Sequence, residues 1–284
     1  MNRLFFKNIL LLFFLVTTLT GCVNLKYVSD FSSSSLKSIR NFEEIGYSFT
    51  MNCLENCQEE KVNNLSFIAL ECDCQANKSA DSVTLIIYNA VKGYLDGLSN
   101  LSNNSLTNYK VNVVAKSLNQ QDYKSLNIEK THVDAWLNIS NILFKAFTNK
   151  YRRSKIKEYV NAGNEPLKVL TGFLDFNLSE NLSGKLNVQK QRLKDYYFDL
   201  TNDTTLSTFE KRNAAADYYN RINKIEDKQK ELTTYSKILK KVAGGHQKLT
   251  DNLQRLNKDE VMEQLIQYSS DIQDLITEYN KIAK

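Results

Sequence analysis

Residues 261–282 read VMEQLIQYSSDIQDLITEYNKI, and apolar side chains return in this stretch at alternating intervals of four and three residues. The positions on this pattern are Val261, Leu265, Tyr268, Ile272, Leu275, Tyr279 and Ile282. An α-helix with this spacing carries one apolar stripe, as helices in bundles and coiled coils do. The stretch therefore predicts a long packed helix and, with it, an all-α fold.

A second stretch, with a seven-residue period, comes directly before this one. Its apolar positions are Tyr218, Ile225, Leu232, Leu239, His246 and Leu253, and the later ones are followed three places on by Tyr235, Val242, Leu249 and Leu256. We expect two helices that are joined near residues 257–259 and pack as an antiparallel, coiled-coil-like hairpin over residues 207–284. The pair Gly244-Gly245 either kinks the first helix or lets a neighbouring helix approach closely.

The rest of the chain also favours helices. Its 284 residues include one Pro and nine Gly, which are too few turn formers for a many-stranded β-fold. Helical spacing of apolar residues covers the ranges 39–53, 83–98, 133–147, 167–174 and 186–200. Gly163-Asn164 and Pro166 predict a break between two of these helices. The sequence thus indicates one elongated helical bundle over residues 37–284.

The first 22 residues have a different character. Arg3 and Lys7 precede an apolar run at residues 9–16, and the segment closes with Leu19-Thr20-Gly21-Cys22. This layout is typical of a secretory signal peptide, here residues 1–21. The last four residues resemble the lipobox of bacterial lipoproteins, in which cleavage before a cysteine is followed by its lipidation. The resemblance implies that Cys22 becomes the lipidated N-terminus; the alternative is an ordinary thiol behind a signal peptide or membrane anchor.

A lipid on Cys22 places the expected protein in the cell envelope. Val23 stands where many lipoproteins retained in the inner membrane have Asp, which by analogy favours the outer membrane, facing the periplasm. Residues 22–36, with serines at 32–35, are expected to form a flexible tether. Because the leader takes Arg3 and Lys7 with it, the formal net charge falls from +5 to +3, which gives no drive toward nucleic acid.

The cysteines after the lipobox form one cluster. Cys53, Cys57, Cys72 and Cys74 fall within 22 residues. In an exported protein, an even number of clustered cysteines predicts disulfides, and three pairings can be drawn. A four-thiolate metal site is the alternative, although its C-x-C half is unusual for zinc, and redox chemistry lacks a Cys-x-x-Cys motif. We expect two bridges that close the loop between the first two helices.

Two further features offer sites for ligands. Residues 150–157 carry five positive charges, and a second basic stretch spans residues 185–194. The charges of the first stretch are Lys150, Arg152, Arg153, Lys155 and Lys157. Such stretches bind anionic lipid or an anionic envelope polymer, or else form a solvated helix face. His246 lies on the heptad seam, where it is either an interhelical hydrogen-bonding residue or a metal ligand or catalytic base.

No sequence motif points to catalysis. The chain lacks a Gly-x-Ser-x-Gly elbow, a Gly-rich phosphate loop, a His-Glu-x-x-His helix and an EF-hand pattern. We therefore expect a non-catalytic, lipid-anchored envelope protein that binds another envelope protein or has a structural role, without metal, cofactor or nucleic acid. The alternatives are binding of anionic lipid or polymer through the basic stretches, and a metal-binding or hydrolytic function of His246.

Overall fold

A computed structural model describes residues 25–66, 71–102, 128–148, 155–253, 255 and 259–282. Over these residues the chain is helical and has no β-strand, so the predicted all-α bundle is confirmed. None of the helices in these ranges combines the length and the apolar character needed to cross a membrane. In chain order the helices are α2 (Leu25–Ile39), the 3-10 helix η1 (Arg40–Glu44), α3 (Phe49–Asn63), α4 (Gln75–Ser102), α5 (Lys130–Thr148), α6 (Ile156–Asp175), the π-helical η3 (Phe176–Leu182), α7 (Ser183–Asn202), α8 (Thr208–Asp251) and α9 (Asp259–Ile282).

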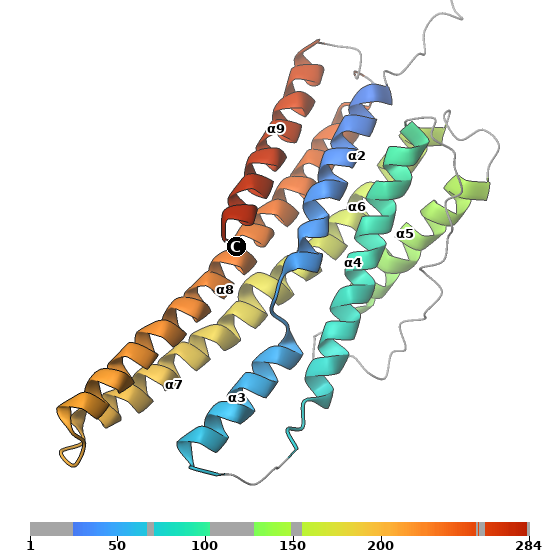
Figure 1. The fold of residues 1–284 in the computed structure, drawn as a ribbon. Coiled ribbons are helices and arrows are strands. Elements are labelled where there is room, and N and C mark those ends of the chain that lie inside the picture. Colours follow the sequence, from blue (N-terminus) through green and yellow to red (C-terminus); the bar gives the residue numbers. More distant parts are fainter. Residues whose placement is uncertain are drawn as a thin grey trace, which may run out of the picture.

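Helix α8 runs along the whole length of the molecule (Figure 1). Its 44 residues extend over about 66 Å at 1.5 Å per residue. Helices α2, α6 and α9 pack against its C-terminal half, and α7 packs against its N-terminal half. The bundle is therefore thick at the end where α2 begins and α8 ends, which we call the N-terminal end, and thin at the turn between α7 and α8.

Helix α2 corrects the expectation of a flexible tether over residues 22–36. From Leu25 onward this segment is a helix, and it lies between α4, α8 and α9 with Phe31 fully buried. Four of its serines, Ser29, Ser32, Ser35 and Ser38, are buried as well, and Ser32 Oγ donates to the carbonyl oxygen of Val28 at 2.6 Å. A small side chain satisfied in this way fits a close helix contact, although a run of serines in sequence looks like a linker.

The predicted antiparallel hairpin is present at the C-terminal half of α8. Lys237 pairs with Glu278 at 3.4 Å, and further along Lys241 pairs with Asp271. Helix α8 continues through both glycines, and a Cβ added at Gly245 would lie 2.6 Å from atoms of Phe31 and Tyr268. The close-approach interpretation of the glycine pair is therefore correct. Because α9 has only 24 residues, the N-terminal half of α8 pairs with α7 instead.

Two predicted boundaries were wrong. Helix α6 runs unbroken through Gly163 and Pro166. The glycine allows a close contact and does not end the helix, because a Cβ at Gly163 would lie 2.4 Å from the Tyr94 hydroxyl. The expected helix over residues 39–53 is interrupted between η1 and α3, where Ser48 caps α3 by accepting from the N–H of Met51.

Candidate functional site

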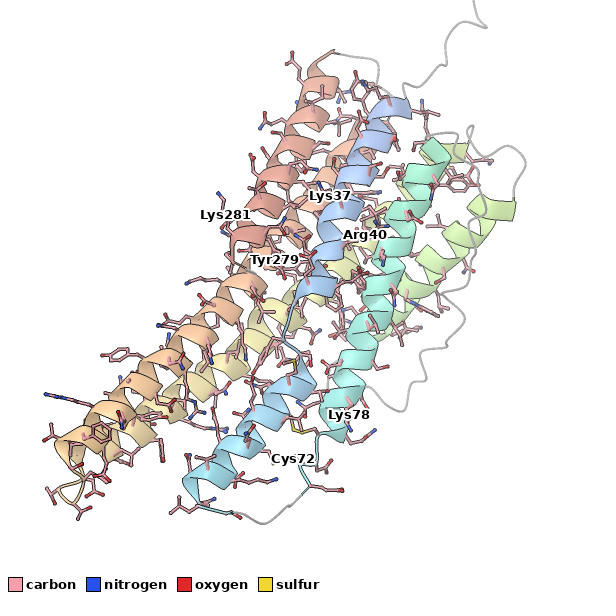
Figure 2. All side chains as sticks on the ribbon, in the orientation of Figure 1. Lys37, Arg40, Cys72, Lys78, Tyr279 and Lys281 are labelled. Atoms are coloured by element: carbon pink, nitrogen blue, oxygen red, sulfur yellow. A yellow bond between two sulfur atoms is a disulfide. The ribbon has the colours of Figure 1, made fainter. Side chains whose placement is uncertain are left out.

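Two disulfides join α3 to the segment that leads into α4. Cys53 pairs with Cys74 and Cys57 with Cys72, the nested arrangement among the three that can be drawn. Figure 2 labels Cys72 in this segment, beside α3. The predicted disulfides are therefore confirmed, and they close the connection between α3 and α4.

The start of α3 is also tied to α4, through Asp81. Its carboxylate accepts hydrogen bonds from the backbone N–H groups of Phe49 and Thr50, both at 2.9 Å. A carboxylate at a helix N-terminus satisfies free N–H groups and opposes the positive end of the helix dipole. Helix α3 is thus held to α4 at its first turn and through its two cysteines, and its other side is left to face α7 and α8.

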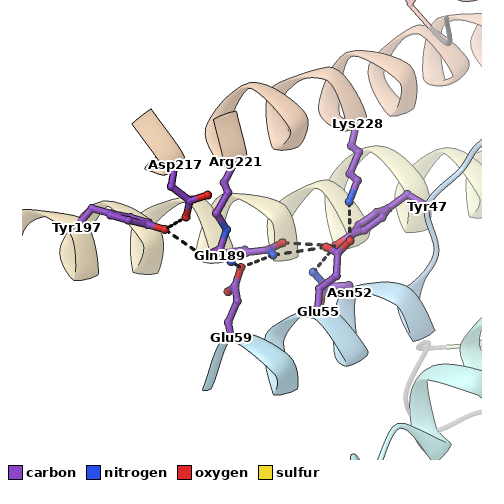
Figure 3. Close-up of polar contacts among 9 residues, drawn as sticks. All are labelled: Tyr47, Asn52, Glu55, Glu59, Gln189, Tyr197, Asp217, Arg221 and Lys228. Atoms are coloured by element: carbon purple, nitrogen blue, oxygen red, sulfur yellow. Dashed lines mark hydrogen bonds and ion pairs between the residues drawn. The ribbon is translucent and has the colours of Figure 1, made fainter. Parts of the chain in front are cut away.

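Between α3 and α7 lies a series of polar contacts (Figure 3). Tyr47, in the turn before α3, accepts a hydrogen bond from Asn52 Nδ2 at 2.9 Å and donates to Glu55 Oε2 at 3.1 Å. Gln189 of α7 is 3 % exposed and donates through Nε2 to Glu59 Oε1 at 2.9 Å. These contacts make the interface between the two helices polar at its centre, where apolar packing is the usual solution.

Helix α8 supplies the positive charges that balance the glutamates of α3. Arg221 Nη2 pairs with Glu59 Oε1 at 2.5 Å, and Lys228 Nζ pairs with Glu55 Oε1 at 2.7 Å. The Lys228 ammonium also lies 4.1 Å from the centre of the Tyr47 ring, within cation–π range. Both ion pairs are partly shielded from water, so they hold α3 against α8 more effectively than fully exposed pairs would.

Tyr197 connects these contacts to the first turns of α8. Its hydroxyl donates to Asp217 Oδ2 and accepts from Arg221 Nη1 at 3.4 Å. Burial raises the pKa of Tyr47 and of Tyr197, and the neighbouring carboxylates Glu55 and Asp217 raise it further because they repel a phenolate. Both phenols therefore stay protonated and remain hydrogen-bond donors at neutral pH.

Two polar clefts flank the contact between α3 and α7. The first encloses about 390 Å³ between α3, α7 and α8. Its charged lining residues are Glu55, Glu59, Asp217, Arg221, Lys224 and Lys228. The second encloses about 330 Å³ between α3 and α7. Its polar lining includes Asn56, Asn63, Asn64, Glu60, Arg192 and Tyr196. Glu59 and Leu193 line both clefts, so the two spaces lie on either side of these residues.

Asn56, which lines the second cleft, has an acceptor that is left over. Its Nδ2 donates to Asn52 Oδ1 at 3.0 Å. Its Oδ1 is buried, yet it has no hydrogen-bond partner among the residues that the structure describes. An unpaired acceptor of this kind costs free energy in the folded state, and because the atom is buried a molecule in the cleft does not reach it.

The turn between α7 and α8 carries exposed aromatic residues. Phe198, Phe209 and Tyr219 are 65 %, 72 % and 65 % exposed, whereas Tyr197, directly before Phe198, is buried. We call residues 196–219 the tip. Exposed aromatics are typical of contact sites for other proteins, since burying them yields a large apolar area.

The basic stretches predicted from the sequence are only partly described. Cys22 and the first three basic residues, Lys150, Arg152 and Arg153, lie outside the described residues, whereas Lys155 and Lys157 lie at the start of α6. Lys155 forms an ion pair with Glu158.

The position of α6 brings these two lysines to the N-terminal end of the bundle. Asn164 of α6 bonds to Gln247 of α8, and further along Asp175 bonds to Ser236. The two helices are thus antiparallel, so the start of α6 lies at the end of α8.

His246 lies in the thick part of the bundle and is fully buried. Its Nε2 lies 2.7 Å from the Tyr94 hydroxyl, and its Nδ1 lies 3.0 Å from Asn164 Oδ1. The interhelical hydrogen-bonding interpretation is therefore confirmed, and both ring nitrogens are occupied by protein groups. Burial lowers the pKa of His246 to about 3, so the imidazole is neutral. Within the described ranges, no group of three or more His, Cys, Asp or Glu side chains is placed to hold a metal ion.

Sequence reasoning missed the polar contacts between α3, α7 and α8. Their members are spread over 182 residues of sequence, from Tyr47 to Lys228, and no single stretch contains a motif. A weaker signal was present: Glu55 and Glu59 share one face of their helix, as Arg221 and Lys228 do on theirs. One helix thus carries a negative face and the other a positive face, which predicts that the two helices pack against each other. A comparison with known proteins finds no family model, curated protein or solved structure that matches this chain.

Proposed function

We propose that this protein is a non-catalytic, lipid-anchored component of the cell envelope that binds another envelope protein through its tip. The observation that carries the proposal is the position of the exposed aromatics Phe198, Phe209 and Tyr219, at the opposite end of the molecule from the first described residue, Leu25. Contact sites at which a few aromatic anchors supply most of the binding energy are common between proteins.

The direction of α2 supports this arrangement. Phe31 packs beside Gly245, and eight residues later the carbonyl oxygen of Ile39 accepts from the Tyr235 hydroxyl at 3.1 Å. Helices α2 and α8 are thus antiparallel, and Leu25 lies near the C-terminal end of α8. Since the lipobox cysteine, Cys22, precedes Leu25 by three residues, a lipid there would hold this end at the membrane and leave the tip farthest from it.

Photo-crosslinking in intact cells tests the tip. A photoreactive amino acid at Phe209 or Tyr219 is expected to give one discrete protein adduct, identified by mass spectrometry. The matched control is Ile266 of α9, which is 57 % exposed and lies far from the tip along the bundle. Adducts of equal yield from Ile266, or none from either tip position, would contradict the proposal. Cys22→Ser tests the anchor separately, because it should move the protein from the membrane fraction to the soluble fraction.

A second function, binding of anionic lipid, is favoured by the place of the basic stretch. Lys155 and Lys157 start α6 at the N-terminal end of the bundle, which is the end that a lipid on Cys22 would hold at the bilayer. Each basic residue near an anionic surface contributes on the order of 1 kcal/mol. Non-lipidated protein should then sediment with phosphatidylglycerol vesicles at low salt and be released at high salt. Charge reversal at Arg152 and Arg153 should abolish this binding; sedimentation that is indifferent to both changes would exclude it.

A further inference from the structure

We propose that the two polar clefts beside the α3–α7 contact bind a neutral oligosaccharide. The inference goes beyond the proposed function and does not rest on it, because the exposed aromatics Phe198, Phe209 and Tyr219 line neither cleft. Volumes of about 390 and 330 Å³ fall in the range of small-ligand sites, roughly 300–1,000 Å³. The shared lining residues Glu59 and Leu193 make the clefts neighbouring subsites, which suits a ligand of more than one ring.

The charge of the first cleft argues against a charged ligand. Its three acidic and three basic lining residues cancel, and two of the pairs are closed by the contacts Arg221–Glu59 and Lys228–Glu55. The charged lining therefore carries no net charge, which gives an anion or a cation no overall attraction to this cleft. The apolar lining residues Val62, Leu193 and Ile225 lie among these charged groups, so a purely apolar molecule here would cover charges without replacing their hydrogen bonds.

The groups that remain suit hydroxyls. A carboxylate that already accepts from one partner keeps other lone pairs, a guanidinium keeps other N–H donors, and each carboxamide both donates and accepts. The second cleft presents three carboxamides together with Glu60 and Arg192. A sugar hydroxyl also both donates and accepts, so it can use every one of these groups. The three carboxamides are those of Asn56, Asn63 and Asn64.

Tyr196 adds a surface for the ring of a sugar. It lines the second cleft and is partly exposed, and its own ring meets the Tyr197 ring edge-on at a centroid distance of 5.1 Å, a T-shaped contact. An aromatic face carries negative charge density, and the C–H face of a pyranose is weakly positive, so the two stack favourably. Planar polar groups around one aromatic ring therefore match both faces of a saccharide.

A purely structural role explains these features less well. Apolar side chains of similar size would hold α3 against α7 and α8 at no loss of stability, and often with a gain. The ion pairs position α3, but they do not require two hollow spaces beside it. A ligand in these spaces accounts for them.

Titration calorimetry on the exported, disulfide-bonded protein tests the proposal. The probes are the neutral oligosaccharides chitotetraose and maltotetraose, with a hyaluronan tetrasaccharide as the anionic control of equal length. We expect saturable binding of at least one neutral probe, and binding of the anionic probe at least tenfold weaker. Asn56→Ala and Arg192→Ala should each weaken the neutral probe at least tenfold.

Two matched variants make the result specific. Asn220→Ala and Arg212→Ala remove the same groups from exposed positions of α8 outside both clefts, and they should bind as the unmodified protein does. Arg192 is exposed, so its variant keeps the test valid if Asn56→Ala fails to fold. The proposal is overturned if no neutral probe binds at millimolar concentration, if the anionic probe binds more tightly, or if both cleft variants bind normally.

Discussion

Among single residues, His246 illustrates how burial sets the charge of a side chain. Burial lowers its pKa to about 3, whereas in the unfolded chain it binds a proton near pH 6.5. Because the unfolded state takes up that proton and the folded state does not, the free energy of unfolding falls as the pH drops below about 6.5. From pH 7.5 to pH 5.5 this group alone removes about 1.4 kcal/mol. We expect His246→Gln, which keeps hydrogen-bonding groups but does not titrate, to lose less stability over this interval in urea unfolding.

His132 provides the control for this measurement. Burial lowers its pKa as well, but it is only partly buried, and Glu129 opposes the shift by favouring the charged form. His132→Gln should therefore change the pH dependence less than His246→Gln does. An acid sensitivity that is the same in His246→Gln and in the unmodified protein would show that His246 is not held neutral in the core.

Two glycines of the bundle differ in the space that surrounds them. A Cβ at Gly245 would lie 2.6 Å from Phe31 Cε2 and from Tyr268 Cδ1, so Gly245→Ala should destabilise the protein by about 1–3 kcal/mol. Gly172 of α6 has nothing within 4 Å of the same position, so Gly172→Ala should stabilise it by about 0.5–1 kcal/mol. Urea unfolding of both variants measures the two signs. Equal effects would mean that α2 and α9 do not pack against α8 as closely as described.

At the scale of the helices, α3 depends on covalent links more than on packing. Only two of its side chains, Phe49 and Asn52, are buried, and just one of them is apolar. Its contacts with α7 and α8 are polar. The two disulfides close loops of 21 and 15 residues, and a loop of the shorter length contributes about 3 kcal/mol in the chain-entropy account. We expect replacement of all four cysteines by serine to speed hydrogen exchange in α3 while α8 and α9 stay protected.

The pattern of exchange distinguishes local from global roles of the disulfides. Faster exchange confined to α3 would agree with a helix held mainly from α4. Faster exchange throughout the chain would contradict it, because the bridges would then be needed by the whole bundle. Unchanged exchange in α3 would mean that the ion pairs from Arg221 and Lys228 suffice to hold it.

Periodicity predicted the helices, but it did not predict their ends or their neighbours. The stripe on α9 and the period of α8 predicted the hairpin, since a buried face requires regular spacing. Residues 25–36 were mistaken for a tether because serines such as Ser32 and Ser35 are polar and common in linkers. In the structure their small side chains fit a close contact between helices. Pro166 was taken for a helix start, although packing of α6 against α8 outweighs its missing N–H. Burial in three dimensions decided each of these cases.

The candidate site was harder to predict than the fold. The cysteine cluster predicted two bridges from composition and spacing, but the pairing depends on how α3 faces the segment before α4. The contacts of Gln189, Glu59 and Arg221 come from three helices, and only the packing of those helices brings them together. In the sequence these residues are far apart and share no motif, so the site can be recognised only once the packing of the helices is known.

For the molecule as a whole, the short link before α2 would determine how the body sits at a membrane if Cys22 carries the proposed lipid. Only residues 23 and 24 separate Cys22 from Leu25. A flexible tether of 15 residues would have an r.m.s. length of about 20 Å and would let the body tumble at the surface. With two residues, a lipid on Cys22 would hold the N-terminal end close to the headgroups. The tip would then lie roughly 65 Å farther along α8.

Energy transfer to labelled lipid measures this orientation. A donor fluorophore at Asp251, the exposed last residue of α8, should transfer efficiently to an acceptor in the vesicle surface, whereas a donor at Phe209 of the tip should transfer weakly. Non-lipidated Cys22→Ser protein, which lacks the anchor, provides the background for both positions. Equal transfer from Asp251 and Phe209 in the lipidated protein would contradict an upright body, because it is the result expected if the molecule lies flat or tumbles. Strong transfer from Asp251 alone would place the aromatic tip away from the bilayer, where a protein partner can reach it.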